Sequence, residues 1–134
     1  LDNSPVLIEL ISYSISKKVI IRGDQIVIKI NIRDDCNFYE QSNYRNLLTT
    51  DLLKSVEART ATKIRNDAMA YLNRSQELGI DCVGFGVLVG QQYPKLWGQI
   101  APKWHEIYPQ VKFELDVRSK IRRTGLTIRS IELK

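Results

Sequence analysis

Residues 81–108, DCVGFGVLVGQQYPKLWGQIAPKWHEIY, constrain the fold most, because large rings and backbone punctuation are concentrated there. The stretch holds both tryptophans and two of the four prolines, together with several glycines. Its apolar side chains recur at steps of three and four, which places both indoles on one stripe of a helix or of two short helices in line: Trp97, Ile100, Ala101, Trp104, Ile107 and Tyr108. Such a stripe needs a sheet to cover it, so we expect a packed centre.

Length and composition predict one ordinary globular domain. A chain of 134 residues with 43% hydrophobic and 26% charged residues can bury a core without staples. No apolar run approaches the roughly 18 residues that cross a bilayer. Because the chain opens on LDNSP, without an initiator Met or a leader, we expect residues 1–134 to be a single domain cut from a longer protein.

Two strands and a turn are predicted first. Residues 5–13 are rich in Ile, Val and Leu, and residues 25–33 alternate with the period of two of a strand that has one buried face. Between them, Arg22-Gly23-Asp24-Gln25 predicts a turn in which Gly23 supplies a positive φ. The pair is predicted to be an antiparallel hairpin, with a first arm that continues to Ile21.

Helices follow this hairpin. Residues 34–46 are polar and lack a period, which predicts a loop leading to a helix start at Thr49 or Thr50. Apolar residues between positions 51 and 78 then fit one helical face, and Gly79 follows as a left-handed C-terminal cap. Because this apolar stripe is thin near its middle, one end of the helix is expected to overhang or to pack on something outside the sequence.

Shorter helices occupy the next stretch. Asp81 is expected to cap a helix from about Cys82 to Gln92, in which Gly86 and Gly90, one turn apart, let another backbone approach closely. Pro94 is expected to begin the third helix. Pro102 should either break that helix or start its final turn, and Pro109 should end it.

The last strand completes the predicted fold. Residues 111–121 place apolar side chains on one face and charged side chains on the other. Thr124-Gly125 is expected to be a bulge or turn, with a short edge strand at 126–133 as an addition. The predicted class is α+β: a small, mainly antiparallel sheet, in the order β-β-α-α-α-β, with helices packed on one face.

Catalytic and metal-binding patterns are absent from the sequence. His105-Glu106 lacks the second histidine of HExxH, the glycines near position 84 do not complete a P-loop or a dinucleotide turn, and neither GxSxG nor SxxK occurs. Cys36 and Cys82 cannot complete a zinc set with one histidine, and they are expected to be unpaired, with a disulfide as the alternative in an oxidising compartment. We expect no enzyme, no metal and no cofactor.

Charge is uneven, since residues 110–134 hold 7 Lys and Arg against 3 Asp and Glu. Cations near the end of the last strand, three of them at alternate positions, are the candidate partner contacts: Arg118, Lys120, Arg122 and Arg123. They could meet an acidic protein surface, lipid headgroups or nucleic acid, and a solvated face is the simpler alternative. No aromatic residue is interleaved with them, which weakens a single-strand nucleic-acid interpretation.

Four blocks occur in order: DCVGFG at 81–86, YPKLW at 93–97, Trp104 with Tyr108, and KIRRTG at 120–125. In type and spacing they resemble the C-terminal domain of the spore germination receptor C subunit family, the Ger(x)C lipoproteins. Each block alone is weak, whereas four together are specific. The chain departs from the family pattern at Cys82, Gly98 and Pro102, which affects the continuity of the tryptophan helix.

The resemblance implies a non-enzymatic subunit domain of a spore germinant receptor, with no catalytic residue to carry over. Its implied partners are membrane-embedded A and B subunits, and an upstream lipid would hold the full-length lipoprotein on the outer face of the spore inner membrane. The fragment itself is expected to be soluble, and the alternative function is a small basic nucleic-acid-binding module. Motif residues are expected to be structural: Asp81, Gly84, Phe85, Gly86, Tyr93, Pro94, Trp97, Trp104 and Gly125.

Overall fold

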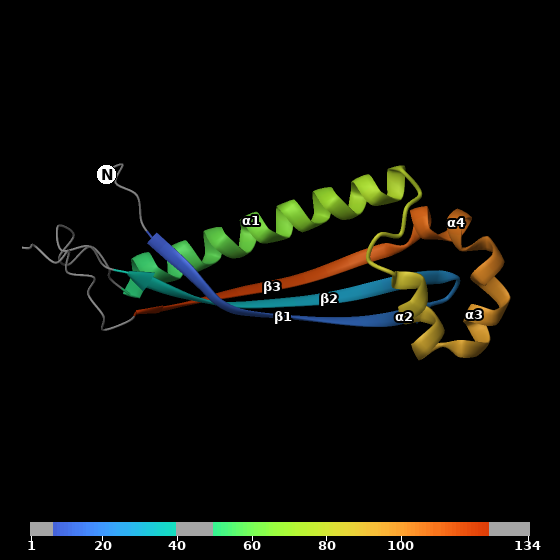
Figure 1. Cartoon of the computed structure of the whole chain (residues 1–134), viewed down its shortest axis with the longest axis horizontal. Coiled ribbons are helices and arrows are strands. Elements are labelled where there is room, and N and C mark those ends of the chain that lie inside the picture. Colours follow the sequence, from blue (N-terminus) through green and yellow to red (C-terminus); the bar gives the residue numbers. More distant parts are fainter. Residues whose placement is uncertain (1–6, 40–49, 124–134) are drawn as a thin grey trace, which may run out of the picture. The chain divides into compact units, whose positions relative to one another are not determined.

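The structure is a computed structural model, and it describes residues 7–39 and 50–123. β1 (Leu7–Arg22) and β2 (Gln25–Tyr39) form a hairpin whose tight turn contains Gly23, with a φ of 61° in the left-handed region. β3 (Lys112–Arg123) follows the helices, and the described strands form one sheet in the order β1-β2-β3 (Figure 1). The predicted hairpin and its glycine turn are therefore confirmed.

The helices fall between β2 and β3, which confirms the α+β class and the predicted order of elements (Figure 1). The first is α1 (Thr50–Glu77), and shorter ones follow: α2 (Phe85–Gln92), α3 (Pro94–Ile100) and α4 (Trp104–Ile107). Short 3-10 turns, η2 (Ala101–Lys103) and η3 (Tyr108–Gln110), flank α4. The prolines at the second positions of these turns interrupt the helix, as the sequence predicts, because proline lacks a donor N–H.

The β3 strand lies beside β2 and runs in the same direction, as the colours in Figure 1 show. The starts of the two strands are close, since Gln25 and Val111 line one pocket. Near their other ends, an Arg122 guanidinium nitrogen lies 3.8 Å from a carboxylate oxygen of Asp35. Parallel neighbours need a long crossover, and the helical segment supplies it, so the sheet contains one antiparallel and one parallel pair.

The predicted loop at 34–46 is wrong over its first part, because β2 continues to Tyr39. Asp34 and Cys36 keep the alternation of the preceding isoleucines, and they are only 7% and 4% exposed. Asp34, a charged residue at a buried position, interrupts the run of isoleucines, so the residue types no longer show the period of two that the strand keeps. Residues 40–46 and the predicted last strand at 126–133 lie outside the described residues.

The C-terminus of α1 matches the prediction of a glycine cap. Gly79 has a φ of 67°. Its N–H donates to the Gln76 carbonyl at 3.1 Å, and the Ile80 N–H donates to the Ser75 carbonyl at 2.9 Å. This pair of bonds satisfies the last carbonyls of the helix and reverses the chain.

The chain divides into two compact units, and β1, β2, α1 and β3 contribute residues to both. The first unit comprises residues 1–14, 32–63 and 117–134, and the second comprises 15–31 and 64–116. In the first unit the Ile121 side chain is buried, and its N–H donates to a Glu57 carboxylate oxygen at 3.0 Å. The second unit holds the larger buried cluster: Val19, Ile26, Val27, Ile28, Ile30, Leu72, Phe85, Val89, Tyr108 and Val111.

Candidate functional site

The carboxylate of Asp81 organises the start of α2. One of its oxygens accepts the N–H groups of Gly84 and Phe85 at 3.0 and 2.8 Å, and the other accepts that of Gly86 at 2.8 Å. Gly84 itself has a φ of 84°, which a residue with a side chain rarely adopts. The predicted start near Cys82 is therefore wrong: the left-handed Gly84 delays the helix to Phe85, while Asp81 still binds its free N–H groups.

An indole is tied to the same carboxylate. The Trp104 Nε1–H donates to Asp81 Oδ2 at 3.0 Å, so the residue that caps α2 also fixes the first residue of α4. The two indole rings lie edge to face, with centroids 5.4 Å apart and an interplanar angle of 71° between Trp97 and Trp104. Both tryptophans are half-buried, and aromatic pairs prefer this geometry.

Two glycines of α2 make room for these rings. A Cβ at Gly86 would lie 2.8 Å from Trp97 Cη2 and 2.9 Å from Trp104 Nε1, and one at Gly90 would lie 2.9 Å from Trp97 Cδ1. Close approach is the reason that the sequence predicts for these glycines, but the approaching groups are indoles and not another backbone. α2 and α3 thus pack together through ring-on-glycine contacts.

Tyr108 connects this ring cluster to α1 and β3. Its side chain is 1% exposed, and its ring centroid lies 5.8 Å from that of Trp104 and 6.3 Å from that of Phe113. Its hydroxyl is 2.6 Å from Ser75 Oγ, and Gln76 Nε2 donates to the Tyr108 carbonyl at 3.0 Å. Burial raises the pKa of the Tyr108 phenol, and the hydrogen bond to Ser75 opposes this effect.

The sequence reading missed the polar partners of the cluster. Ser75 follows Leu72 by one helical turn, and both are buried, so the spacing of i and i+3 was the available signal. The Asp81–Trp104 bond joins residues 23 positions apart, and no local pattern predicts it.

The remaining motif residues lie at the borders of this cluster. Phe85 is 1% exposed and its ring centroid lies 5.0 Å from that of Phe113. Tyr93 is 37% exposed and precedes Pro94, the first residue of α3. Gly125 lies outside the described residues. Among the described motif residues, Phe85, Gly86, Trp97 and Trp104 thus make packing contacts.

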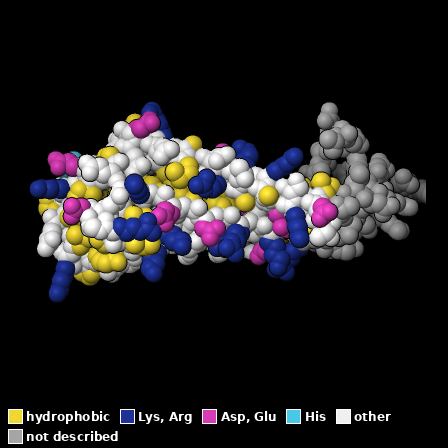
Figure 2. All heavy atoms as spheres, turned by 180° about the vertical axis from the view of Figure 1, so that it is seen from behind, with side chains coloured by type: hydrophobic (Ala, Val, Ile, Leu, Met, Phe, Trp, Pro, Cys, Tyr) yellow, Lys and Arg dark blue, Asp and Glu magenta, His cyan; other side chains and the backbone are white. Residues whose placement is uncertain are grey.

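The basic end of β3 lies on one face of the strand. The side chains of Arg118, Lys120 and Arg122 are exposed, whereas that of Ile121 between them is buried. Arg122 faces Asp35 across the sheet at 3.8 Å. On the face in Figure 2, Lys and Arg side chains are interspersed with Asp and Glu side chains. Arg123 is the last residue of β3; its side chain lies outside the described residues.

A metal site in the described part of the chain would need several titratable side chains close together. No group of three or more His, Cys, Asp or Glu side chains is placed to hold a metal ion there. His105 and Glu106 are exposed, with His105 Nε2 3.7 Å from Glu106 Oε1. Cys36 is a buried free thiol whose pKa is raised by burial and by Asp34, and Cys82 is an exposed free thiol.

Among the described helices, none is both long enough and apolar enough to cross a membrane. A family model described as "Spore germination B3/ GerAC like, C-terminal" matches residues 2–125. A solved structure entitled "Crystal Structure of the GerBC protein" is similar in fold, with a TM-score of 0.72 at 18% identity over 88% of this chain. The match spans 41% of that longer chain. The comparison with curated proteins finds no match.

Proposed function

Because the chain belongs to the spore germination B3/GerAC-like C-terminal family, we propose that it acts through protein–protein contacts at the spore inner membrane during nutrient-triggered germination. The family model over residues 2–125 is the observation that carries this proposal. The fold shared with the GerBC protein supports it. The role is that of a non-enzymatic receptor-subunit domain.

The proposed partners are the membrane-embedded A and B subunits of the germinant receptor. In the full-length protein, a lipid upstream of this domain would hold it on the outer face of the membrane. The domain would then need a surface that contacts those subunits rather than a membrane span of its own. We propose that the first compact unit carries this surface.

Two features of the first unit support that assignment. Lys120 and Arg122 project from the solvated face of β3, where cations can meet an acidic partner surface. On β1, large apolar side chains of the same unit are exposed, Leu10 by 56%, Ile11 by 53% and Tyr13 by 68%. Grouped exposed apolar residues mark interaction sites in soluble proteins, so this unit offers both charge and apolar area.

Charge reversal in the full-length subunit tests the contact surface. Lys120→Glu with Arg122→Glu should leave the circular-dichroism spectrum and Tm of the purified domain close to wild type, because both side chains are exposed. Spores carrying the same two changes should germinate at least about tenfold more slowly, since like charges across a contact oppose binding. Lys95→Glu with Lys103→Glu, two exposed cations of the second unit, is the matched control and should germinate normally. Normal germination of the β3 variant would remove β3 from the contact.

The nucleic-acid alternative is not favoured, because the family match points to receptor subunits. It makes a distinct prediction, since binding to phosphates through several cations weakens steeply as salt rises. A mobility-shift titration with short DNA and RNA at physiological salt separates the two functions. Micromolar or tighter binding would support the alternative and displace the receptor role.

A further inference from the structure

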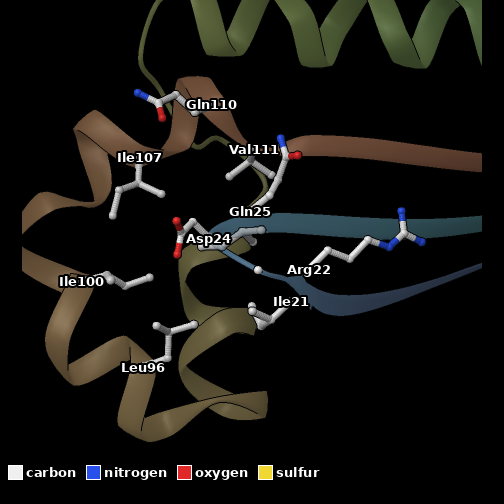
Figure 3. A pocket seen from close by; sticks show the side chains of 11 residues that line it. Ile21, Arg22, Asp24, Gln25, Leu96, Ile100, Ile107, Gln110 and Val111 are labelled. Atoms are coloured by element: carbon white, nitrogen blue, oxygen red, sulfur yellow. The ribbon is translucent and has the colours of Figure 1, made fainter.

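A pocket of about 480 Å³ opens in the second unit, between the hairpin turn and the helical segment before β3 (Figure 3). Six of its eleven lining residues are aliphatic: Ile21, Ile26, Leu96, Ile100, Ile107 and Val111. In Figure 3, Leu96, Ile100 and Ile107 project from the helical segment toward the side of the hairpin where Ile21 lies. The volume is within the range of about 300–1,000 Å³ that is typical of small-molecule sites.

The aliphatic walls are only partly used in packing. Ile26 and Val111 are buried at 8% and 5% exposure, whereas Ile21, Leu96 and Ile100 are half-buried. All five residues line the pocket. An apolar ligand there would take apolar surface out of water, which is the driving force for filling such a pocket.

Charge at the mouth of the pocket selects the kind of polar group that a ligand can carry. Arg22 is paired with Glu114 at 2.7 Å, and in Figure 3 its guanidinium extends along the strand, away from the helices. Asp24 is exposed, points toward the helices in the same view, and has no ion-pair or hydrogen-bond partner among the described residues. With Gln25 and Gln110 as neutral neighbours on the lining, the mouth carries one uncompensated negative charge.

From these two features we infer that the pocket binds a small aliphatic amine, with its hydrocarbon part between the hairpin and α3 and its ammonium group at the Asp24 carboxylate. The ammonium group of the ligand would pair with the Asp24 carboxylate. The hydrocarbon chain of the ligand would cover the half-buried side chains of Ile21 and Ile100. A carboxylate of the same length would place like charges together at the mouth. An alcohol would fill the pocket without the ionic contact.

Methyl NMR of the 134-residue chain, labelled at Ile and Leu, tests the inference with three probes of equal length: n-hexylamine, n-hexanol and n-hexanoate. Hexylamine should shift the methyl signals of Leu96, Ile100 and Ile107 at lower concentration than hexanol, and hexanoate should bind most weakly. Raising the salt concentration should reduce the difference in Kd between hexylamine and hexanol, because salt screens exposed charges.

Asp24→Asn keeps the size of the turn residue and removes its charge. It should raise the Kd for hexylamine by about three- to fivefold, the effect of an exposed ionic contact, and leave that for hexanol unchanged. Asp51→Asn, which removes one charge in the first turn of α1, is the control and should bind hexylamine as wild type does. A lysine side chain carries the same chemistry, so Nα-acetyl-lysine amide distinguishes a peptide source and should bind more weakly than hexylamine.

Four results would overturn the inference: no shift of the lining methyl signals with any probe, hexanoate binding as tightly as hexylamine, an unchanged Kd for hexylamine in Asp24→Asn, or tighter binding of the lysine amide. The first would show that the hollow is not a ligand site. The second and third would show that Asp24 does not select the ligand. The fourth would identify a protein side chain as the occupant.

Discussion

The carboxylate of Asp81 accepts four hydrogen bonds from other residues. It accepts three backbone N–H groups at the start of α2 and the indole N–H of Trp104. A neutral residue of the same size would keep some of these hydrogen bonds. Truncation to alanine would leave all four donors without their acceptor. All four of these donors belong to the protein itself, which supports the expectation that Asp81 is a structural residue.

Asp81→Ala should lower the free energy of unfolding by about 2–3 kcal/mol, because hydrogen bonds to a charged acceptor are lost and their donors must find water. Urea denaturation measures this change. The Nε1–H signal of Trp104 should also exchange faster with solvent. Wild-type stability together with an unchanged exchange rate of the indole N–H would show that the carboxylate does not hold Trp104.

Gly86 tests whether the glycines exist to admit the indoles. Gly86→Ala should destabilise the protein by about 1–3 kcal/mol, the cost of overpacking, since the new Cβ would lie 2.8 Å from a Trp97 ring carbon. Gly98→Ala in α3 is the matched control: nothing lies within 4 Å of its Cβ position, and alanine favours a helix by up to about 1 kcal/mol. Equal effects of the two changes on thermal unfolding would contradict the packing role.

Because the Tyr108 phenol is buried, we expect the free energy of unfolding to depend on pH in the alkaline range. Burial raises its pKa in the folded state, so the folded protein holds the phenol proton after the unfolded chain has lost it. Its contribution to stability is full below about pH 10, the unfolded value, and is lost as pH rises from there through the higher folded value. Tyr108→Phe should weaken this alkaline loss in urea titrations at several pH values, and an identical loss would show that another group causes it.

At the scale of elements, the sequence predicts best where one period runs without interruption. The alternation in β3, the turn at Gly23 and the end of α1 at Gly79 follow from local chemistry, and the structure contains them. The extension of β2 was missed because Asp34 occupies a buried position that its residue type does not suggest. The late start of α2 was missed because a left-handed Gly84 looks like any other glycine in sequence.

The candidate site was less predictable than the fold, because its contacts join distant residues. Spacing alone indicated that Gly86 and Gly90 admit a neighbour, but not that the neighbour is an indole. The hollow beside Asp24 depends on the hairpin turn and the helical segment meeting. Neither segment contains a pattern for the other.

Among the described strands, β1 lies at an edge of the sheet, and a residue of α2 contacts this edge. Gln92, at the end of α2, accepts the Val19 N–H at 2.8 Å through its side-chain oxygen, and its side-chain nitrogen lies 3.5 Å from the Lys17 carbonyl. A side-chain amide thus stands in for a neighbouring strand, which satisfies backbone groups that an edge otherwise leaves open.

Gln92→Ala should therefore speed hydrogen exchange of the Val19 amide by about fivefold, the equivalent of one hydrogen bond of about 1 kcal/mol. Gln91→Ala, an exposed neighbour on the same helix, should leave that exchange rate unchanged. Two-dimensional NMR after transfer to heavy water gives both rates. Equal acceleration in the two variants would mean that helix propensity, not the edge contact, controls the amide.

At the scale of the whole molecule, the Tyr108 hydroxyl and the Trp104 indole N–H of the ring cluster have hydrogen-bond partners within the protein. The candidate contact residues lie elsewhere, on exposed faces of the strands. The aromatic motif closes on Asp81, Ser75 and its own glycines, while the charged face of β3 and the apolar side chains of β1 are exposed. This division supports the contact function proposed above for this member of the spore germination B3/GerAC-like C-terminal family.

Immunoprecipitation of the full-length protein from spore membranes, followed by detection of the proposed A and B subunits, tests this account most directly. Both subunits should be recovered with the wild-type protein and with the Lys95→Glu, Lys103→Glu control, and much less with Lys120→Glu, Arg122→Glu. Absence of both subunits from the wild-type precipitate would contradict the contact function, and undiminished recovery with the reversed strand would contradict its assignment to β3.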